Sequence, residues 1–413
     1  MRLPASLKPL QERSFRLLWM GQTVSAVGDG LVSVALAFAV LRIGGSASEL
    51  GLVLAATAAS RVVFFLVGGV WADRLPRQLV MLAADVVRAG QQIVIGLLLI
   101  SGSARVWHLL LGGILFGAAS AFFLPATSGL VPETVAASGL QEANALMGLS
   151  RSATSVVGPA LSGLMVAFFG PGWVFVINSL TFLVSAFSLA LLRVPGRLGP
   201  ARQSFLRDLA RGWHEFAIRP WYWLNLCAHA LWSFGIAAFF VLGPVIAARQ
   251  LGGPSSWGVI AAALGIGAIS GGLLALRFRP SRPLVAGNVA LALAALQPLA
   301  LIPPSPVPVI AAACVLGYAG LIFLNEVWET TMQQLIPPHV MSRVTSYDWM
   351  ISSIPLPIGY AVAGPAAAHF GTAPTLTAAA LIIAVPSLLV VAIPGVRNVY
   401  RRSDGVIVEP GPA

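Results

Sequence analysis

Long apolar stretches recur along almost the whole sequence, and they constrain the fold more than any other feature. A helix needs about 20 mostly apolar residues to cross a hydrocarbon layer of about 30 Å. Only 9% of the 413 residues are charged, whereas a water-soluble protein carries about a quarter, so most of the surface must face lipid. The sequence predicts twelve membrane-spanning helices, near residues 17–41, 50–72, 79–101, 107–128, 145–169, 172–192, 222–248, 256–276, 284–302, 307–328, 346–369 and 373–394.

The predicted fold class is therefore an all-α polytopic membrane protein. The first apolar segment is too long for a cleavable signal peptide and lacks a convincing cleavage site, so we expect it to remain as the first helix. Cys227 and Cys314 both lie in apolar stretches, which indicates neither a disulfide framework nor a metal site. The last two spans are interrupted by prolines, which membrane helices tolerate; these are Pro355, Pro357, Pro365 and Pro374.

Arginine accounts for almost all of the positive charge, and its distribution predicts the orientation of the chain. Cytoplasmic loops of membrane proteins carry an excess of Lys and Arg. With the N-terminus inside, only three basic residues fall in the outer loops, Arg42, Arg105 and Arg249. Both termini are therefore predicted to be cytoplasmic. Because the basic residues do not cluster on one soluble domain, the net charge of +11 indicates orientation and not a nucleic-acid partner.

One polar stretch, residues 193–221, separates the sixth and seventh predicted spans. Its apolar residues recur at helical spacing, which predicts a short amphipathic helix on the cytoplasmic membrane surface; they are Phe205, Leu206, Leu209, Trp213 and Phe216. The expected organisation is an N-terminal six-helix bundle, this linker, a C-terminal six-helix bundle and a cytoplasmic tail, at residues 1–192, 193–221, 222–396 and 397–413.

The two predicted bundles share short motifs in the same order. The matched motifs, all about 205 residues apart, are Gly68-Gly69 with Gly271-Gly272, Leu130 to Pro132 with Leu335 to Pro337, Glu142 with Asp348, and Gly158-Pro159 with Gly364-Pro365. Gly (42) and Pro (29) are abundant enough for single matches to arise by chance, but several matches in order at one offset indicate a repeat. Parallel repeats of this kind place a transport pathway between two bundles.

The segment after the second predicted span reads Gly69-Val-Trp-Ala-Asp73-Arg74-Leu-Pro-Arg77. Together with the repeat, it resembles the major facilitator superfamily, whose loop at this place has a Gly, an Asp four residues later followed by Arg, and a further basic residue. The resemblance implies the major facilitator fold of twelve transmembrane helices in two parallel six-helix repeats. It also implies a gating role for Gly69, Asp73, Arg74 and Arg77, which would hold the cytoplasmic side closed. The second half departs from the pattern, with Leu276 where the Asp would fall.

A second motif, Gly158-Pro159-Ala-Leu-Ser-Gly163, lies in the fifth predicted span. It is similar to the motif of proton-coupled drug antiporters in this superfamily, in which Gly and Pro kink the helix and pack it against a neighbour. This resemblance favours export. The alternative interpretation is an ordinary Gly/Pro packing site.

Other features resemble the branch of the superfamily that includes siderophore exporters of the enterobactin type and macrolide efflux proteins. They are Gly28-Asp29, Asp73-Arg74, Asp85 with Arg88, Pro125 to Pro132 leading to Ala143-Asn144, and Gln333 to Pro337 leading to Arg343. The last departs from the branch pattern, because Ser342 stands where Gly would precede the Arg. The resemblance carries almost no information about the substrate.

Two charged residues lie deep inside predicted spans. Asp29 lies about 20 Å beyond Arg16 at about 1.5 Å per residue, and Arg61 lies at a similar depth in the second span. An ionisable group inside a span is a functional candidate. We therefore expect Asp29 and Arg61 to approach each other, directly or through water, and Asp29 to bind the transported proton. The alternative is a permanent structural ion pair that never titrates.

Further charged residues are predicted to gate or support the pathway. Asp85 and Arg88 are three residues apart on one helix face and can neutralise each other, which favours gating or structural support over substrate contact. In the second half, Arg343 and Asp348 are the expected gating residues. The glutamates near the end of the tenth span, Glu326 among them, form an acidic cluster with Asp348. This cluster could attract a cationic substrate, but we favour pairing with arginines.

Polar and aromatic residues inside the spans are candidates for the wall of a substrate cavity. They are Gln22, Asn178, Asn225, His229, Trp232 and Glu326. For His229 the alternative is a hydrogen-bonded histidine in the core. Tryptophan near the end of a span is usually an interfacial anchor.

These features predict a secondary active transporter that exports a hydrophobic or amphipathic small molecule, such as a drug, a siderophore or a secreted metabolite, by proton antiport and alternating access. No GxxxxGK[ST] phosphate loop is present, so an ion gradient is the expected source of energy. A proton-coupled uptake symporter is the first alternative. A membrane enzyme fits poorly because the five histidines are scattered, and a membrane sensor fits poorly because no soluble signalling domain is present.

The expected partners of such a transporter are its small-molecule substrate, protons and the lipid bilayer. We expect no nucleic acid, no cofactor and no metal ion. The sequence predicts a monomer that spans the plasma (inner) membrane several times, and its richness in arginine and alanine favours a bacterial source.

Overall fold

The computed structural model describes residues 5–72, 75–194 and 219–409. Within these ranges, 11 helices are long and apolar enough to cross a membrane. A shorter apolar helical stretch, Pro283–Leu299, lies where the ninth span was predicted. The predicted all-α polytopic membrane fold is therefore confirmed. The amphipathic helix predicted in the linker falls on residues 195–218, outside the described part of the chain.

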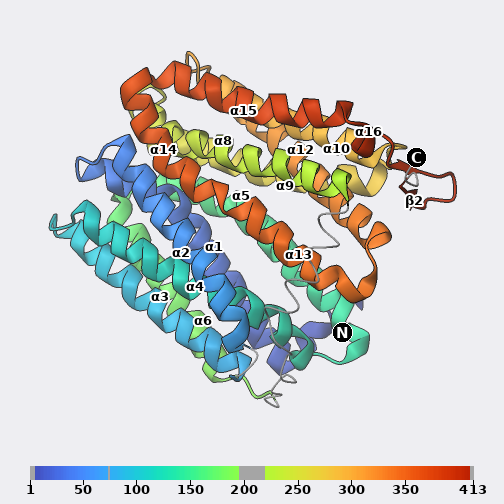
Figure 1. Ribbon diagram of the computed structural model, residues 1–413. Coiled ribbons are helices and arrows are strands. Elements are labelled where there is room, and N and C mark those ends of the chain that lie inside the picture. Colours follow the sequence, from blue (N-terminus) through green and yellow to red (C-terminus); the bar gives the residue numbers. More distant parts are fainter. Residues whose placement is uncertain (1–4, 73–74, 195–218, 410–413) are drawn as a thin grey trace. The chain divides into compact units, whose positions relative to one another are not determined.

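The chain divides into two compact units, and the first contains Met1–Ala201 together with Ala247–Ala262. Its described elements before the linker are η1 (Ala5–Gln11), α1 (Arg13–Arg42), α2 (Ala47–Ala72), α3 (Arg77–Ile100), α4 (Val106–Thr134), η2 (Ala137–Gly139), α5 (Leu140–Phe169) and α6 (Pro171–Ala190). Helix α1 packs on α5 and α6, α3 packs on α4 and α6, and α2 packs on α4 (Figure 1). Two residues in this unit, Arg61 and Asp29, therefore lie on helices with different main neighbours.

The second unit contains Arg202–Ile246 and Ala263–Ala413. The elements that follow the linker are α8 (Pro220–Gln250), α9 (Pro254–Arg277), α10 (Pro283–Ala292), η3 (Leu293–Ala295), α11 (Leu296–Leu299), α12 (Val307–Leu335), α13 (Pro338–Ser353), α14 (Pro355–Phe370), α15 (Thr372–Ala392), α16 (Pro394–Arg397), β1 (Tyr400–Arg401) and β2 (Ile407–Val408). Helix α10 packs on α12 and α15. The stretch predicted as a tail thus starts at the last residue of α16 and contains a two-stranded hairpin.

Proline breaks two of the predicted spans in the second unit. The ninth span is divided into α10, a 3-10 turn and α11, which contains Pro298. The eleventh span is divided where α13 ends at Ser353 and α14 begins at Pro355. Proline lacks a backbone N–H and its ring clashes with the carbonyl group of the preceding turn. Helix α14 therefore begins at Pro355, and the regular α-helix is interrupted in the turn before Pro298.

Equivalent glycine turns join the last two long helices of each half. Gly170 ends α5 and precedes α6 with a φ of 83°, and Gly371 ends α14 and precedes α15 with a φ of 93°. A side chain is strained at positive φ, so both turns require glycine. The same device at corresponding places supports the predicted repeat.

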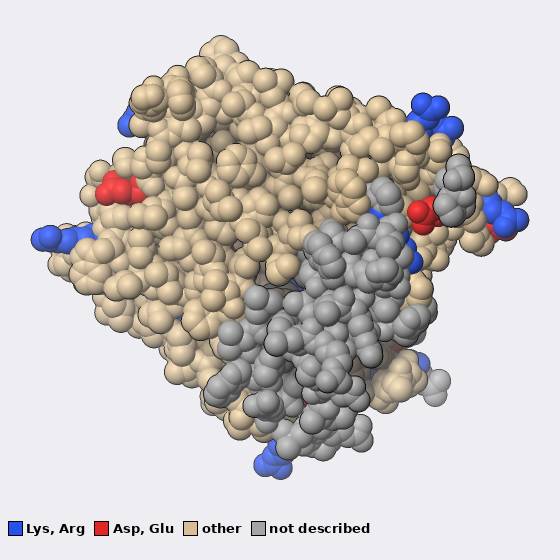
Figure 2. All heavy atoms as spheres, in the orientation of Figure 1, with Lys and Arg blue, Asp and Glu red and all other residues tan. Residues whose placement is uncertain are grey.

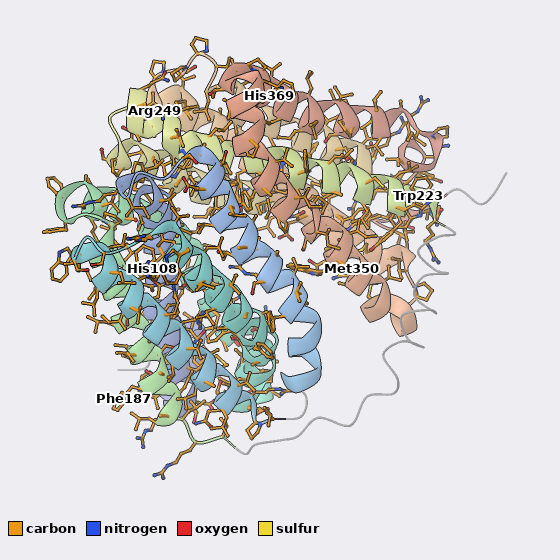
Figure 3. All side chains as sticks on the ribbon, turned by 60° about the vertical axis from the view of Figure 1, so that its left-hand side comes forward. His108, Phe187, Trp223, Arg249, Met350 and His369 are labelled. Atoms are coloured by element: carbon orange, nitrogen blue, oxygen red, sulfur yellow. The ribbon has the colours of Figure 1, made fainter. Side chains whose placement is uncertain are left out.

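Apolar side chains cover the outer surface of the long helices. On α3, for example, Val86, Val94 and Leu97 are 54%, 54% and 56% exposed. Such side chains are solvated by lipid, and Figure 2 shows a broad area without Lys, Arg, Asp or Glu. Trp223 near the start of α8 and His369 near the end of α14 mark opposite ends of the second unit (Figure 3).

Candidate functional site

Three charged residues meet inside the first unit, and we call them the charge triad: Asp29 on α1, and Asp85 and Arg88 on α3. The Arg88 guanidinium donates a hydrogen bond from Nη2 to Asp85 Oδ1. Its Nη1 lies 3.9 Å from Asp29 Oδ2. The i,i+3 spacing on α3 places Asp85 and Arg88 on one helix face, and the packing of α1 and α3 on α6 brings Asp29 to the same place.

Two aromatic rings cover the guanidinium of Arg88. Its Cζ lies 4.1 Å from the ring centroid of Phe123 on α4 and 4.4 Å from that of Phe182 on α6. A desolvated guanidinium gains about 2 kcal/mol or more from a cation–π contact. The Arg88 side chain is only 4% exposed, so these rings and Asp85 hold the positive charge in place. Sequence reasoning missed both rings, because nothing in their spacing separates them from ordinary core residues.

The two carboxylates of the triad differ in their access to solvent. Asp85 is fully buried, whereas the Asp29 side chain is 41% exposed. One arginine charge faces two carboxylates, and Asp29 Oδ1 and Asp85 Oδ2 are buried without a hydrogen-bond partner among the described residues. A single bound proton would supply the missing donor and balance the charge. The triad is therefore chemically suited to bind one proton.

Helix α1 is held against α6 by polar contacts on either side of Asp29. Gln22 donates to Ser185 Oγ at 3.2 Å. A Cβ at Gly28 would collide with Asn178 Oδ1 and with Thr181 on α6, so only glycine allows this approach. Asn178 is fully buried in that contact. It was expected to line a cavity, but the close packing of α1 on α6 encloses it.

The cation beside the Asp29 carboxylate is Arg88 and not Arg61, which was predicted. Arg61 is exposed on α2, and among the described residues the cation that forms an ion pair with Asp29 is Arg88. Equal depth in two helices does not place side chains together when the helices face different neighbours. Helix α2 packs mainly on α4, while α1 packs on α5 and α6. Arg88 therefore takes the place expected for Arg61.

Part of the predicted gating cluster is visible at the start of α3. Arg77 donates from Nη1 to Glu133 Oε1 and to Gly129 O on α4, both at 2.8 Å. Asp73, Arg74 and the surroundings of Gly69 lie outside the described residues. Glu133 was missed, although it directly follows the proline of the Leu130 to Pro132 motif near the end of the fourth span.

The antiporter-type motif on α5 makes close backbone contacts within the first unit. A Cβ at Gly158 would lie 2.7 Å from Gly30 Cα on α1, and a Cβ at Gly163 would lie 2.8 Å from Gly258 Cα, which belongs to the same unit. Pro159 lies inside α5 next to Gly158 and is buried. Both glycines therefore act as packing sites, and the Gly30 contact is one residue from Asp29.

The second unit binds its buried carboxylate, Asp348, with neutral donors. Trp328 Nε1 donates to Asp348 Oδ2 at 2.7 Å and the Tyr222 hydroxyl donates to the same oxygen at 3.0 Å. Ser352 donates to Oδ1 at 3.4 Å. The side chain of Arg343, the expected gating partner, lies outside the described residues. Asp348 thus joins α13 to α8 and α12.

Two of the predicted cavity residues line a small cavity, which is also lined by Trp328, a hydrogen-bond donor to Asp348. Its volume is about 10 Å³, and Asn225 and His229 are among its lining residues, so it has space for about one water molecule. The His229 ring lies 5.3 Å from that of Trp232. Glu326 is exposed on α12. Among the described residues, no group of three or more His, Cys, Asp and Glu side chains could hold a metal ion.

The fold and these embedded charges define a polytopic membrane transporter. A family model of the major facilitator type, described as "Transmembrane secretion effector", matches residues 4–403. The chain therefore belongs to this family. The predicted superfamily and the prediction of a transporter and not an enzyme are both confirmed.

Similar proteins carry the names of efflux proteins. The chain is 26% identical over 417 residues to the multidrug efflux pump Tap of Mycobacterium tuberculosis, which covers 95% of this chain and 96% of that protein. It is 24% identical over 353 residues to macrolide efflux protein A of Streptococcus pyogenes, which covers 84% of this chain and 87% of that protein. These relatives support assignment to the efflux transporters.

Solved structures share the fold. The nucleoside transporter NupG matches with a TM-score of 0.74 at 12% identity, covering 92% of this chain and 98% of that chain. A bacterial homologue of the human lysosomal transporter Spinster matches with a TM-score of 0.66 at 15% identity, covering 94% and 98%. At such identities the likeness shows the fold alone.

Proposed function

We propose that this protein exports hydrophobic or amphipathic small molecules by proton antiport, with Asp29 as the proton-binding group. The single observation that carries the proposal is the charge triad, in which one buried arginine serves two carboxylates. Two carboxylates and one guanidinium carry a net charge of −1, which one bound proton would neutralise. In alternating access, the binding sites open first to one side of the membrane and then to the other. Entry of the proton would in this way be coupled to exit of the substrate.

Asp29 is better placed than Asp85 to exchange the proton. Asp85 is fully buried and bonded directly to Arg88, whereas the Asp29 side chain is 41% exposed and lies 3.9 Å from Arg88. A charged side chain within a membrane span faces a water-filled space and not lipid. The exposed part of Asp29 would therefore face the pathway from which the proton arrives.

Protonation would change the electrostatic interaction between Asp29 on α1 and Arg88 on α3. With Asp29 ionised, its carboxylate and that of Asp85 share Arg88. With Asp29 protonated, the Coulomb attraction across the 3.9 Å separation is lost and Arg88 is bound by Asp85 alone. Helix α1 would then be freer to shift against α3, which gives proton binding a mechanical effect within the first unit.

Export and the class of substrate are supported by the relatives and by the chain itself. The two efflux relatives are named for multidrug and macrolide transport. Few charges lie within the described spans, which suits an apolar or amphipathic compound. The distribution of arginine supports a plasma-membrane protein with both termini in the cytoplasm.

Accumulation assays in cells test export. Cells with and without the protein are loaded with a macrolide and with a fluorescent cationic dye, with and without a proton uncoupler. We expect lower accumulation in cells that contain the protein, and we expect the uncoupler to abolish the difference. Higher accumulation in these cells would indicate uptake, and export that persists with the uncoupler would contradict proton coupling.

Reconstituted liposomes test the role of Asp29. We expect Asp29→Asn to lose transport driven by an imposed pH gradient while still equilibrating the substrate down its own gradient. Glu409→Gln, which removes an exposed carboxylate outside the spans, is the control and should behave as wild type. Gradient-driven transport by Asp29→Asn at the wild-type rate would remove Asp29 from the mechanism.

A further inference from the structure

An ion pair joins two helix ends of the first unit. Arg77, the first residue of α3, binds Glu133 and Gly129 O near the end of α4, each at 2.8 Å. The Glu133 side chain is only 11% exposed, so the pair is partly shielded from solvent. It fastens the beginning of α3 to the end of α4.

The corresponding helix ends of the second unit form no ion pair among the described residues. Helices α4 and α12 have 29 residues each, and Glu133 and Gln334 are in each case the last residue but one. Helix α3 begins at Arg77, whereas α10 begins at Pro283. Arg282 directly precedes Pro283 but forms no ion pair among the described residues, so these helix ends are joined in another way.

A C-terminal hairpin, residues 399–408, makes that connection (Figure 1). Arg401 pairs with Ile407 across the two strands. The Arg401 N–H donates to Ser281 O, in the loop between α9 and α10, and the Ile407 N–H donates to Gln334 Oε1 on α12, both at 2.7 Å. Alternate pairs in an antiparallel ladder direct their N–H groups outward, so one cross-strand pair supplies both bonds.

Apolar burial fixes the same hairpin to the second unit. Val399 and Ile407 are 0% and 2% exposed and belong to one core cluster with Leu284 of α10 and Met332 of α12. Val406, next to Ile407, is 47% exposed. This alternation is that of a hairpin with one buried face, so the hairpin is packed on the unit over its length and not only at two bonds.

We propose that the C-terminal hairpin holds loop 278–282 to the end of α12, and we call it the clasp of the second unit. It would do there what the Arg77–Glu133 pair does at the start of α3 and the end of α4 in the first unit. Its effect on transport rests on the proposed function, because two bundles that move as bodies must each stay rigid. Without the hairpin, we expect loop 278–282 to loosen and export to slow.

Truncation of the full-length protein in detergent tests the clasp. Removal of residues 399–413 should lower the midpoint of thermal unfolding and speed hydrogen exchange in the peptide that contains loop 278–282, by about fivefold to tenfold if about one hydrogen bond is lost. Removal of residues 410–413 alone keeps the whole hairpin and is the matched control. It should change neither measurement.

Point variants on α12 test the bond without removing the hairpin. Gln334→Leu removes the acceptor of the Ile407 N–H, so exchange at the amide of Ile407 should rise. Gln334→Glu keeps an oxygen acceptor and should retain protection. Gln333→Leu, at the exposed neighbour that bonds only to Glu329 in the described structure, is the control on the same helix.

The inference is overturned if the long truncation leaves exchange in loop 278–282 and the unfolding midpoint as in the short truncation, or if Gln334→Leu matches Gln333→Leu. Exchange and unfolding need no substrate. If the full-length protein does not export but its long truncation loosens as expected, only the proposed function is contradicted. If the full-length protein exports and the long truncation does not loosen, only the clasp is contradicted.

Discussion

Among the described residues, the two units stabilise the carboxylates within their helices in different ways. In the first unit, Asp29 and Asp85 share the charged Arg88, and only Asp85 is hydrogen-bonded to it. In the second unit, Asp348 accepts hydrogen bonds from Trp328 and Tyr222, which are neutral. A carboxylate that shares a cation changes its interactions when it gains a proton. A carboxylate that is held by several neutral donors keeps its position and its hydrogen bonds. We therefore expect proton binding to be coupled to transport in the first unit, and Asp348 to have a structural role in the second.

The largest expected effect comes from removing the cation of the triad. Arg88→Ala would leave the buried carboxylate of Asp85 without a counter-ion, which destabilises a protein by about 3–5 kcal/mol, and would also remove the cation beside the partly exposed Asp29. We expect little folded protein in the membrane and a strongly lowered unfolding midpoint, measured by thermal unfolding in detergent. Arg88→Lys keeps the charge but not the flat guanidinium between two rings, so it should fold better and still transport poorly. Normal stability of Arg88→Ala would contradict the buried triad.

A smaller loss is expected from removing the carboxylate of the second unit. Asp348→Ala removes the acceptor of the buried Trp328 N–H, at a cost of about 1–3 kcal/mol, whereas the Tyr222 hydroxyl keeps Val344 O as an acceptor at 3.4 Å. The unfolding midpoint should fall. Any remaining transport should keep its dependence on the pH gradient, because the triad is intact. Gradient-independent transport by this variant would show that coupling also needs Asp348.

A methyl group at Gly28 tests how closely α1 must approach α6 beside Asp29. The new Cβ would collide with Asn178 Oδ1 and with the Thr181 hydroxyl, and overpacking of this kind costs about 1–3 kcal/mol. Gly28→Ala should lower the unfolding midpoint and reduce proton-coupled transport. Gly90→Ala on α3 is the matched control, since a Cβ there meets nothing within 4 Å. Equal behaviour of the two variants would mean that the α1–α6 contact is looser than described.

The smallest effect is expected from deleting one neutral donor. Tyr222→Phe removes one of the two donors to Asp348 Oδ2 and leaves Trp328 bonded at 2.7 Å. A hydrogen bond inside a membrane protein contributes about 0.6 kcal/mol on average, so the unfolding midpoint should fall slightly and transport should be almost unchanged. Loss of pH-dependent transport in this variant would remove the distinction between a fixed and a coupled carboxylate.

Much of the fold followed from local patterns. Runs of apolar residues predicted the helices because a membrane span must be long and apolar, and the Asp85–Arg88 pair followed from i,i+3 spacing. The structure has both. The breaks in the ninth and eleventh spans depend on prolines that the sequence shows, but their effect also depends on which neighbours satisfy the freed backbone groups.

Contacts between helices were less predictable. Depth along two helices suggested Arg61 as the partner of Asp29, whereas α1 packs on α5 and α6 and its Asp29 meets Arg88 of α3. Asn178 was expected in a cavity because it is polar, but the glycine at position 28 lets α1 close over it. The outcome depended on which helices are neighbours in the first case and on how closely two helices approach in the second, and a mostly apolar span gives little pattern from which to read either.

Sequence alone therefore determined that the chain is a helical membrane protein built as two similar halves, with Asp29, Asp85 and Arg88 inside the first. These conclusions rest on length, hydropathy and spacing, which are properties of a single helix. Tertiary structure decided that two carboxylates share one arginine, that Asp348 is bound by neutral donors and that a C-terminal hairpin joins α12 to the loop before α10. These arrangements depend on which helix faces meet, and residues far apart in the sequence come together only through packing.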